Sequence, residues 1–168
     1  MSGKKTAPAE NEEVTEKKNV ALVIDMAKGD IQKLSSVLKT IHYGKMSFNG
    51  KMALVKNGLT IIQKSKELEE ERKLAYDGFI PEEYKKLEEK QTNGEDLTPE
   101  ESDRFSKMNQ QYGIKLNEMF AALNAEQVPM KIIPLSMADY KILMEANESA
   151  INGEGFVYIY QYLTEQED

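Results

Sequence analysis

The sequence contains no cysteine and a single histidine, His42. Disulfide bonds, thiolate zinc sites and cysteine nucleophiles are therefore excluded. One histidine, with no serine or acidic residue placed beside it by a recognisable motif, predicts neither a catalytic triad nor a metal site. The lack of cysteine is compatible with a reducing compartment, and we expect the protein to be cytoplasmic.

Long apolar runs and phosphate-binding motifs are also missing. No stretch approaches about 18 uncharged apolar residues, so no membrane-spanning helix is predicted, and the N-terminus lacks the apolar region of a signal peptide. Neither GxxxxGK[ST] nor GxGxxG occurs. We therefore expect no cofactor and no metal. Direct contact with nucleic acid is not expected either, because the net charge is −7 and phosphate binding needs clustered lysine and arginine.

What is present is typical of one helix-rich domain. The 168 residues are 40% hydrophobic and 30% charged, which is enough to bury one core. Residues 1–18 mix lysine and glutamate with alanine, proline and threonine and hold no aromatic side chain. We expect them to form a disordered tail, followed by a single α+β domain over residues 19–168 that is mainly helical.

Apolar periodicity predicts the first elements of this domain. The β-branched run at 20–25 indicates a buried strand. A helix is expected from residue 31 to about 42, with Asp30 as its N-cap and Gly44 as its C-terminal stop. An apolar stripe at spacings of three and four residues supports this helix.

Two long helices are predicted to follow as an antiparallel hairpin. The first begins near Met52, places Val55, Leu59 and Ile62 on one face, and becomes almost entirely charged in its second half. The second is about 25 residues long and carries one continuous apolar face, which we expect to pack against the helix at 31–42. That face consists of Phe105, Met108, Tyr112, Leu116, Met119, Phe120 and Leu123.

Residues 90–102, KQTNGEDLTPEES, admit two interpretations. A calcium-binding loop would place Gly94 at its sixth position, but the first position lacks the usual aspartate and the normally apolar eighth position is acidic. A turn between helices fits better. Asn93 and Gly94 close one helix, and Thr98 with Glu101 forms a capping box for the next.

The C-terminal third is predicted to contain a strand and a short helix. VPMKIIPLS reads as a strand at a sheet edge, because Pro129 and Pro134 bracket it. This strand is expected to pair with the one near residues 20–25, giving a small two- or three-stranded sheet. Ser136 is suited to cap the following helix, whose inward side chains are predicted to be Met137, Tyr140, Leu143 and Met144.

Residues 155–163 fit both a strand and a helix. Valine, tyrosine and isoleucine favour a strand, whereas the apolar spacing is also compatible with a helix. Drawn as a strand, the segment aligns Phe156, Tyr158, Tyr160 and Tyr162 on one face and leaves the other face apolar too. Such a segment belongs either in the core or in an interface with a partner.

A second candidate contact surface is acidic. Residues 82–104 carry nine acidic and four basic side chains, a net charge of −5. Glu82, Glu83, Glu88 and Glu89 are its first candidate contact residues. This stretch provides either an acidic docking face or simple solubility.

The order of these elements resembles that of small uncharacterised phage and prophage proteins. The similarity lies in a short strand, a helix carrying GDIQKLSSVL, a long charged hairpin, a PEE…F…L helix and a strand such as VPMKIIPLS, over roughly residues 20–163. The resemblance carries no functional residues. It implies an accessory phage protein that acts through protein contacts, in the host cytoplasm or the virion, with a helical last segment.

The sequence therefore favours a non-enzymatic protein-interaction component, acting on a partner or through self-association. Two other functions stay open. The first is an acidic inhibitor that imitates nucleic acid and occupies a host enzyme. The second is an enzyme of unrecognised type.

Overall fold

The computed structural model describes residues 20–165 and shows an α+β fold that is mainly helical, as predicted. Residues 1–18, where the sequence predicts a tail, lie outside the described part. Its elements, in chain order, are β1 (Leu22–Ala27), α1 (Lys28–Leu38), α2 (Phe48–Phe79), α3 (Glu82–Thr92), α4 (Pro99–Ala125), β2 (Gln127–Ile132), α5 (Met137–Asn147) and α6 (Gly153–Leu163). None of the described helices is long and apolar enough to span a bilayer.

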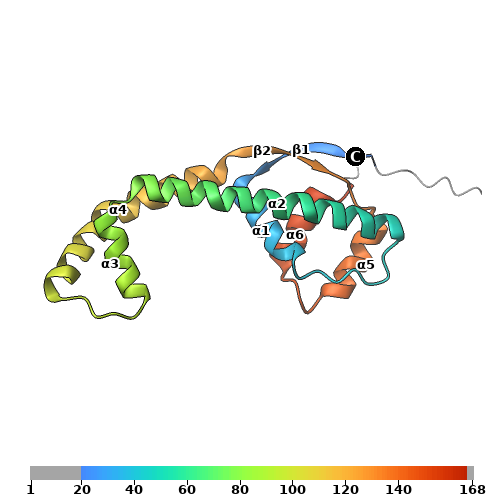
Figure 1. Cartoon of the computed structure of the whole chain (residues 1–168). Coiled ribbons are helices and arrows are strands. Elements are labelled where there is room, and N and C mark those ends of the chain that lie inside the picture. Colours follow the sequence, from blue (N-terminus) through green and yellow to red (C-terminus); the bar gives the residue numbers. More distant parts are fainter. Residues whose placement is uncertain (1–19, 166–168) are drawn as a thin grey trace, which may run out of the picture.

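The molecule has a body and an arm (Figure 1). The body contains the two strands, α1, α5, α6 and the first half of α2. The arm is the second half of α2, which projects from the body, together with α3 at its tip and α4, which returns along it. At 32 residues, α2 is about 48 Å long, and it extends from the body to the start of α3 in the arm (Figure 1).

The two strands form an antiparallel pair, which confirms the predicted pairing. Leu22 lies opposite Ile132 and Ala27 opposite Gln127. Met26 and Met130 are both buried on the face that covers the body. Beyond β2, a single bridge joins Leu135 to Thr164 in parallel. The chain after α6 thereby returns to the edge of the sheet region.

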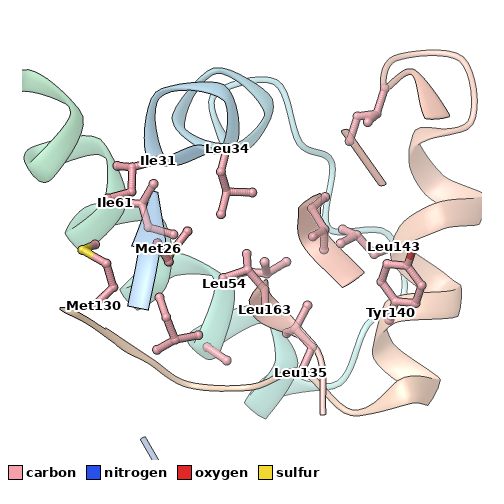
Figure 2. Close-up of a cluster of buried hydrophobic side chains, with 14 of the residues drawn as sticks. Met26, Ile31, Leu34, Leu54, Ile61, Met130, Leu135, Tyr140, Leu143 and Leu163 are labelled. Carbon is pink, nitrogen blue, oxygen red and sulfur yellow. The ribbon is translucent and has the colours of Figure 1, made fainter. Parts of the chain in front are cut away.

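The core of the body draws one or more side chains from almost every element around it (Figure 2). Six of its members are Met26, Ile31, Ile61, Ile132, Leu143 and Leu163, all at most 2% exposed. Burial of each such side chain stabilises the fold by about 1.5–3 kcal/mol. The convergence of β1, α1, α2, β2, α5 and α6 on one cluster explains why Leu22 and Glu165, near the two ends of the described part, line the same hollow.

The limits predicted for the first helix are wrong. Its N-cap is Ala27 rather than Asp30, because β1 runs directly into α1 and the Lys28 N–H donates to the Glu126 carbonyl at 2.9 Å. A tertiary contact thus replaces a capping side chain. The helix ends at Leu38, and Gly44 lies in the loop beyond it, with φ +55°.

The long helix begins at Phe48, four residues before the predicted start near Met52. Ser47 is its N-cap and accepts from the Gly50 N–H. The buried carboxylate of Asp139 holds Ser47, accepting from its N–H and from its hydroxyl, both at 2.7 Å. A residue 92 positions away along the chain therefore determines where α2 starts.

The turn between α3 and α4 forms as predicted. Helix α3 ends at Thr92, and Gly94 adopts φ +73°. Thr98 and Glu101 make the complete capping box at the start of α4. The Glu101 carboxylate also accepts from Lys90 at 2.7 Å, and both interactions hold the pKa of Glu101 below its usual value. The oxygens of this carboxylate are thus committed to the turn.

The predicted packing of the α4 stripe against α1 is wrong for most of its length. Phe105, Met108, Tyr112 and Leu116 instead join a separate distal cluster with Ile80, Tyr84 and Leu87 at the tip of the arm. The reason is the length of α2, which carries the start of α4 beyond the reach of the 11-residue α1. Only the C-terminal end of α4 approaches α1.

The last segment is the helix α6, which resolves the ambiguity between strand and helix. Its buried side chains include Ile159 and Leu163. In the preceding α5, Ser136 caps the helix as predicted, and Tyr140 and Leu143 are buried. Met144, predicted to point inward, is exposed. An 11-residue helix covers the body with one face only, and Met144 lies outside that face.

Candidate protein-interaction surface

The first half of α2 has two faces that differ in composition and in exposure. One face is buried against the body and is composed largely of small or polar residues. Its members are Gly50, Ala53, Leu54, Asn57, Gly58, Ile61 and Ser65. Asp139 lies against Gly50, and Asn57 is paired with the backbone of Ile133. This face, rather than the one with more large apolar side chains, holds the helix in the fold.

The second face is exposed and apolar. Phe48, Met52, Val55, Leu59 and Ile62 lie at spacings of four, three, four and three residues. We call these five residues the α2 seam. Phe48 is 77% exposed, Leu59 68%, Met52 and Val55 38% each, and Ile62 is half-buried. The prediction that Val55, Leu59 and Ile62 share a face is consistent with this structure, but the face looks outward.

A groove of about 170 Å³ runs beside the α2 seam. Leu38, the last residue of α1, also lines it, together with Ile41 and Tyr43 from the loop that follows. Gly58 lines the groove, and a Cβ added at Gly58 would meet no heavy atom within 4 Å. The groove is therefore an apolar hollow along the seam. None of the described residues fills it at Gly58.

The stretch of chain that contains the α2 seam carries charged side chains of one sign only. Residues 31–66 contain seven lysines and no aspartate or glutamate, although the chain as a whole has a net charge of −7. Within residues 20–165, two of these lysines form ion pairs, Lys33 with Glu154 and Lys64 with Glu67. The other five, which we call the lysine rim, have no ion-pair partner there: Lys39, Lys45, Lys51, Lys56 and Lys66.

The tyrosine-rich segment, predicted to lie either in the core or in an interface, makes most of its contacts within the body. Tyr158 accepts from Lys33 at 2.8 Å and stacks on the Tyr162 ring, with 6.4 Å between ring centroids. The Tyr162 hydroxyl donates to Asp30 at 2.5 Å, and burial together with this bond raises its pKa to about 12. These contacts fasten α6 across α1.

The remaining two aromatic residues of that segment differ in exposure. Phe156 is half-buried against the core, and its carbonyl accepts from the Tyr140 hydroxyl at 3.1 Å. Tyr160 is exposed, although its ring lies 5.6 Å from that of Tyr140. Tyr160 and the exposed Val157 therefore present the apolar surface of α6.

The four predicted acidic contact residues all lie on α3, in the distal part of the arm. Glu82 pairs with Lys85 at 3.1 Å, and Glu83 pairs with Arg104 at 3.1 Å. Glu88 accepts from the Tyr76 hydroxyl, and Glu89 is exposed. Cations are thus interleaved with the acidic side chains on this part of the arm.

Two signals in the sequence coincide at the α2 seam, the spacing of its apolar residues and the absence of acidic residues around it. A repeat of four and three residues from Phe48 to Ile62 is visible in the sequence, as is the absence of acid between residues 31 and 66. What the sequence does not show is which face of α2 the body covers. An amphipathic stripe is normally the buried one, and here the small-residue face is buried instead.

Comparison with known proteins yields no relative. No family model, no curated protein sequence and no solved structure matches the chain. Among residues 20–165, no three histidine, aspartate or glutamate side chains gather in a way that could hold a metal ion.

Proposed function

We propose that this chain is a non-enzymatic protein-interaction component that binds a partner through the α2 seam. The observation that carries this proposal is the continuous line of five apolar side chains, from Phe48 to Ile62, on the outer face of α2. Contiguous exposed apolar surface is uncommon on monomeric proteins and marks interaction sites. A role as an accessory component of a phage, which the resemblance implies, stays a prediction.

The energetics support a bound state of the seam. Each apolar square ångström that a partner covers contributes about 25 cal/mol of favourable free energy. The opposite face of α2 supplies Leu54 and Ile61 to the core, and neither Phe48 nor Leu59 belongs to that cluster. Leu59 and Phe48 are therefore available for a partner.

The acidic-inhibitor alternative has less support. An imitation of nucleic acid requires a contiguous negative surface. On the arm, Lys85, Lys90 and Arg104 instead pair with neighbouring carboxylates. The surface is a mixture of both signs, as is common on solvated helices.

Site-specific cross-linking tests the proposal. A photoreactive residue at position 59 should capture a protein in extracts of the native source, whereas the same residue at position 114 should not. Ile114 is a matched control because its side chain is exposed to the same extent as that of Leu59, 68%, but lies on α4. The captured protein is then identified, purified and titrated against wild type and Leu59→Ser. Equal capture at both positions, or equal affinity of both proteins, would contradict the proposal.

A further inference from the structure

We infer that the α2 seam receives an acidic amphipathic α-helix contributed by another protein. The inference rests on the proposed function and specifies the partner's chemistry. It follows from three properties of the seam: its spacing, the hollow beside it and the sign of the charge around it.

The spacing of the seam matches a helical partner. Side chains that repeat every four and three residues align along one side of an α-helix in the manner of coiled-coil core positions. The line from Phe48 to Ile62 contains two such repeats and spans about 21 Å. A partner helix of about four turns would cover it fully.

The hollow at Gly58 gives the partner's side chains a place to insert. In helix pairs, a side chain of one helix enters a hole formed by residues of the other. Gly58 leaves open space where any other residue would place a Cβ, in a groove that Leu38, Val55 and Ile62 also line. The groove thus accepts apolar side chains that project from a helix laid along the seam.

The flanks of the seam specify an acidic partner. Successive residues of an α-helix are rotated by about 100°, which places Lys51 and Lys56 on opposite sides of the seam. In paired helices, the residues that flank the apolar line form ion pairs and determine the choice of partner. Glutamate or aspartate on the partner helix would meet both lysines, and the rest of the lysine rim would attract it at longer range.

The same charges disfavour a second copy of this chain. If two α2 helices paired through their seams, Lys51 and Lys56 of one would face Lys51 and Lys56 of the other. In a parallel pair Lys51 of one copy faces Lys56 of the other, and in an antiparallel pair centred on the seam the two Lys56 side chains face each other. Like charges at flanking positions destabilise a helix pair and act against the wrong partner.

Designed peptides test the partner's chemistry on the full-length chain. Two fluorescent peptides of about 18 residues share leucine at the apolar positions of the heptad, with either glutamate or lysine at the flanking positions. Fluorescence anisotropy should show that the glutamate peptide binds at least about tenfold more tightly than the lysine peptide. Leu59→Ser should weaken binding of the glutamate peptide, and Ile114→Ser should leave it unchanged.

Charge reversal gives the sharpest control. The double variant Lys51→Glu, Lys56→Glu should prefer the lysine peptide, and circular dichroism should show it folded as the wild type. Equal binding of both peptides to wild type, or an unchanged preference in the double variant, would overturn the acidic-helix inference while leaving a protein-binding function intact. A failure of both peptides, together with no specific cross-link at position 59, would overturn both proposals.

Two further results would assign the seam to another occupant. Sedimentation that shows a concentration-dependent dimer, lost in Leu59→Ser, would assign it to a second copy. A cross-link from position 59 to residues 1–19 of the same chain would assign it to the protein's own N-terminal segment. Either result would overturn the inference, and a monomer without this cross-link supports it.

Discussion

The side-chain amide of Asn57 pairs with both backbone groups of Ile133. Its Nδ2 donates to the Ile133 carbonyl at 2.8 Å, and its Oδ1 accepts from the Ile133 N–H at 2.9 Å. Asn57 is 1% exposed. A side chain of α2 thereby provides hydrogen-bond partners for the backbone N–H and C=O of Ile133, just after β2, as a neighbouring strand would.

Replacing this amide should be costly. Asn57→Ala leaves two buried backbone groups of Ile133 without a partner, so we expect the free energy of unfolding to fall by about 2–4 kcal/mol. Asn49→Ala, at an exposed position on the same helix, should change it by less than about 0.5 kcal/mol. Urea denaturation of both variants measures the difference, and equal effects would show that the pairing contributes little.

Replacing two glycines of α2 by alanine should change the stability of the protein in opposite directions. A Cβ at Gly50 would lie 2.5 Å from Cγ of the buried Asp139, so Gly50→Ala should destabilise the protein by about 1–3 kcal/mol. Gly58→Ala meets no heavy atom within 4 Å and should stabilise it by about 0.5–1 kcal/mol through helix propensity. Thermal unfolding gives both values, and a stabilising Gly50→Ala would contradict the packing described for Asp139.

Tyr162 should make stability depend on alkaline pH. Its pKa is raised to about 12, whereas an unfolded tyrosine titrates near about 10. The folded state therefore keeps its proton where the unfolded state loses it, and this contribution is fully present below pH about 10 and lost as the pH rises toward about 12.

Comparison with a phenylalanine isolates this group. Tyr162→Phe should reduce stability by about 1 kcal/mol at neutral pH, because it removes the bond to Asp30. The gap between wild type and variant should narrow between pH about 10 and about 12. Other tyrosines with raised pKa, such as Tyr76 and Tyr84, are present in both proteins. If the difference between the urea midpoints of the two proteins stayed constant throughout this pH range, Tyr162 would not be the source of the pH dependence.

The distal cluster should unfold separately from the body. Phe105 is 7% exposed and packs within that cluster, so Phe105→Ala should reduce the stability of the cluster by about 3–5 kcal/mol. Hydrogen exchange should accelerate in α3 and the first half of α4 and stay unchanged in β1 and α1. Ile31→Ala, in the body core, should accelerate exchange in the body. Uniform acceleration by either variant would show one cooperative unit instead.

Features determined by near neighbours could be predicted from the sequence. The capping box of Thr98 and Glu101 and the turn at Gly94 depend on residues within a few positions of one another. Ser136 caps its helix for the same reason. The two strands could be identified because β-branched and proline-bracketed runs are local signals.

Features determined by distant contacts could not. The start of α2 depends on Asp139, and the start of α1 depends on the Glu126 carbonyl. The covered face of α2 depends on which neighbours reach it, and the body prefers the face with Asn57 and the small residues. Hydrophobicity alone assigns Leu59 to a core, yet it forms part of the outer surface.

The continuity of α2 has a mechanical consequence. One unbroken helix begins beside Asp139 in the body, carries the seam along its first half and ends in the distal cluster. Over its length of about 48 Å, a tilt of about 5° at the body end displaces the other end by about 4 Å. A partner that binds the seam and tilts the body end of α2 slightly would therefore move the tip of the arm by a much larger distance.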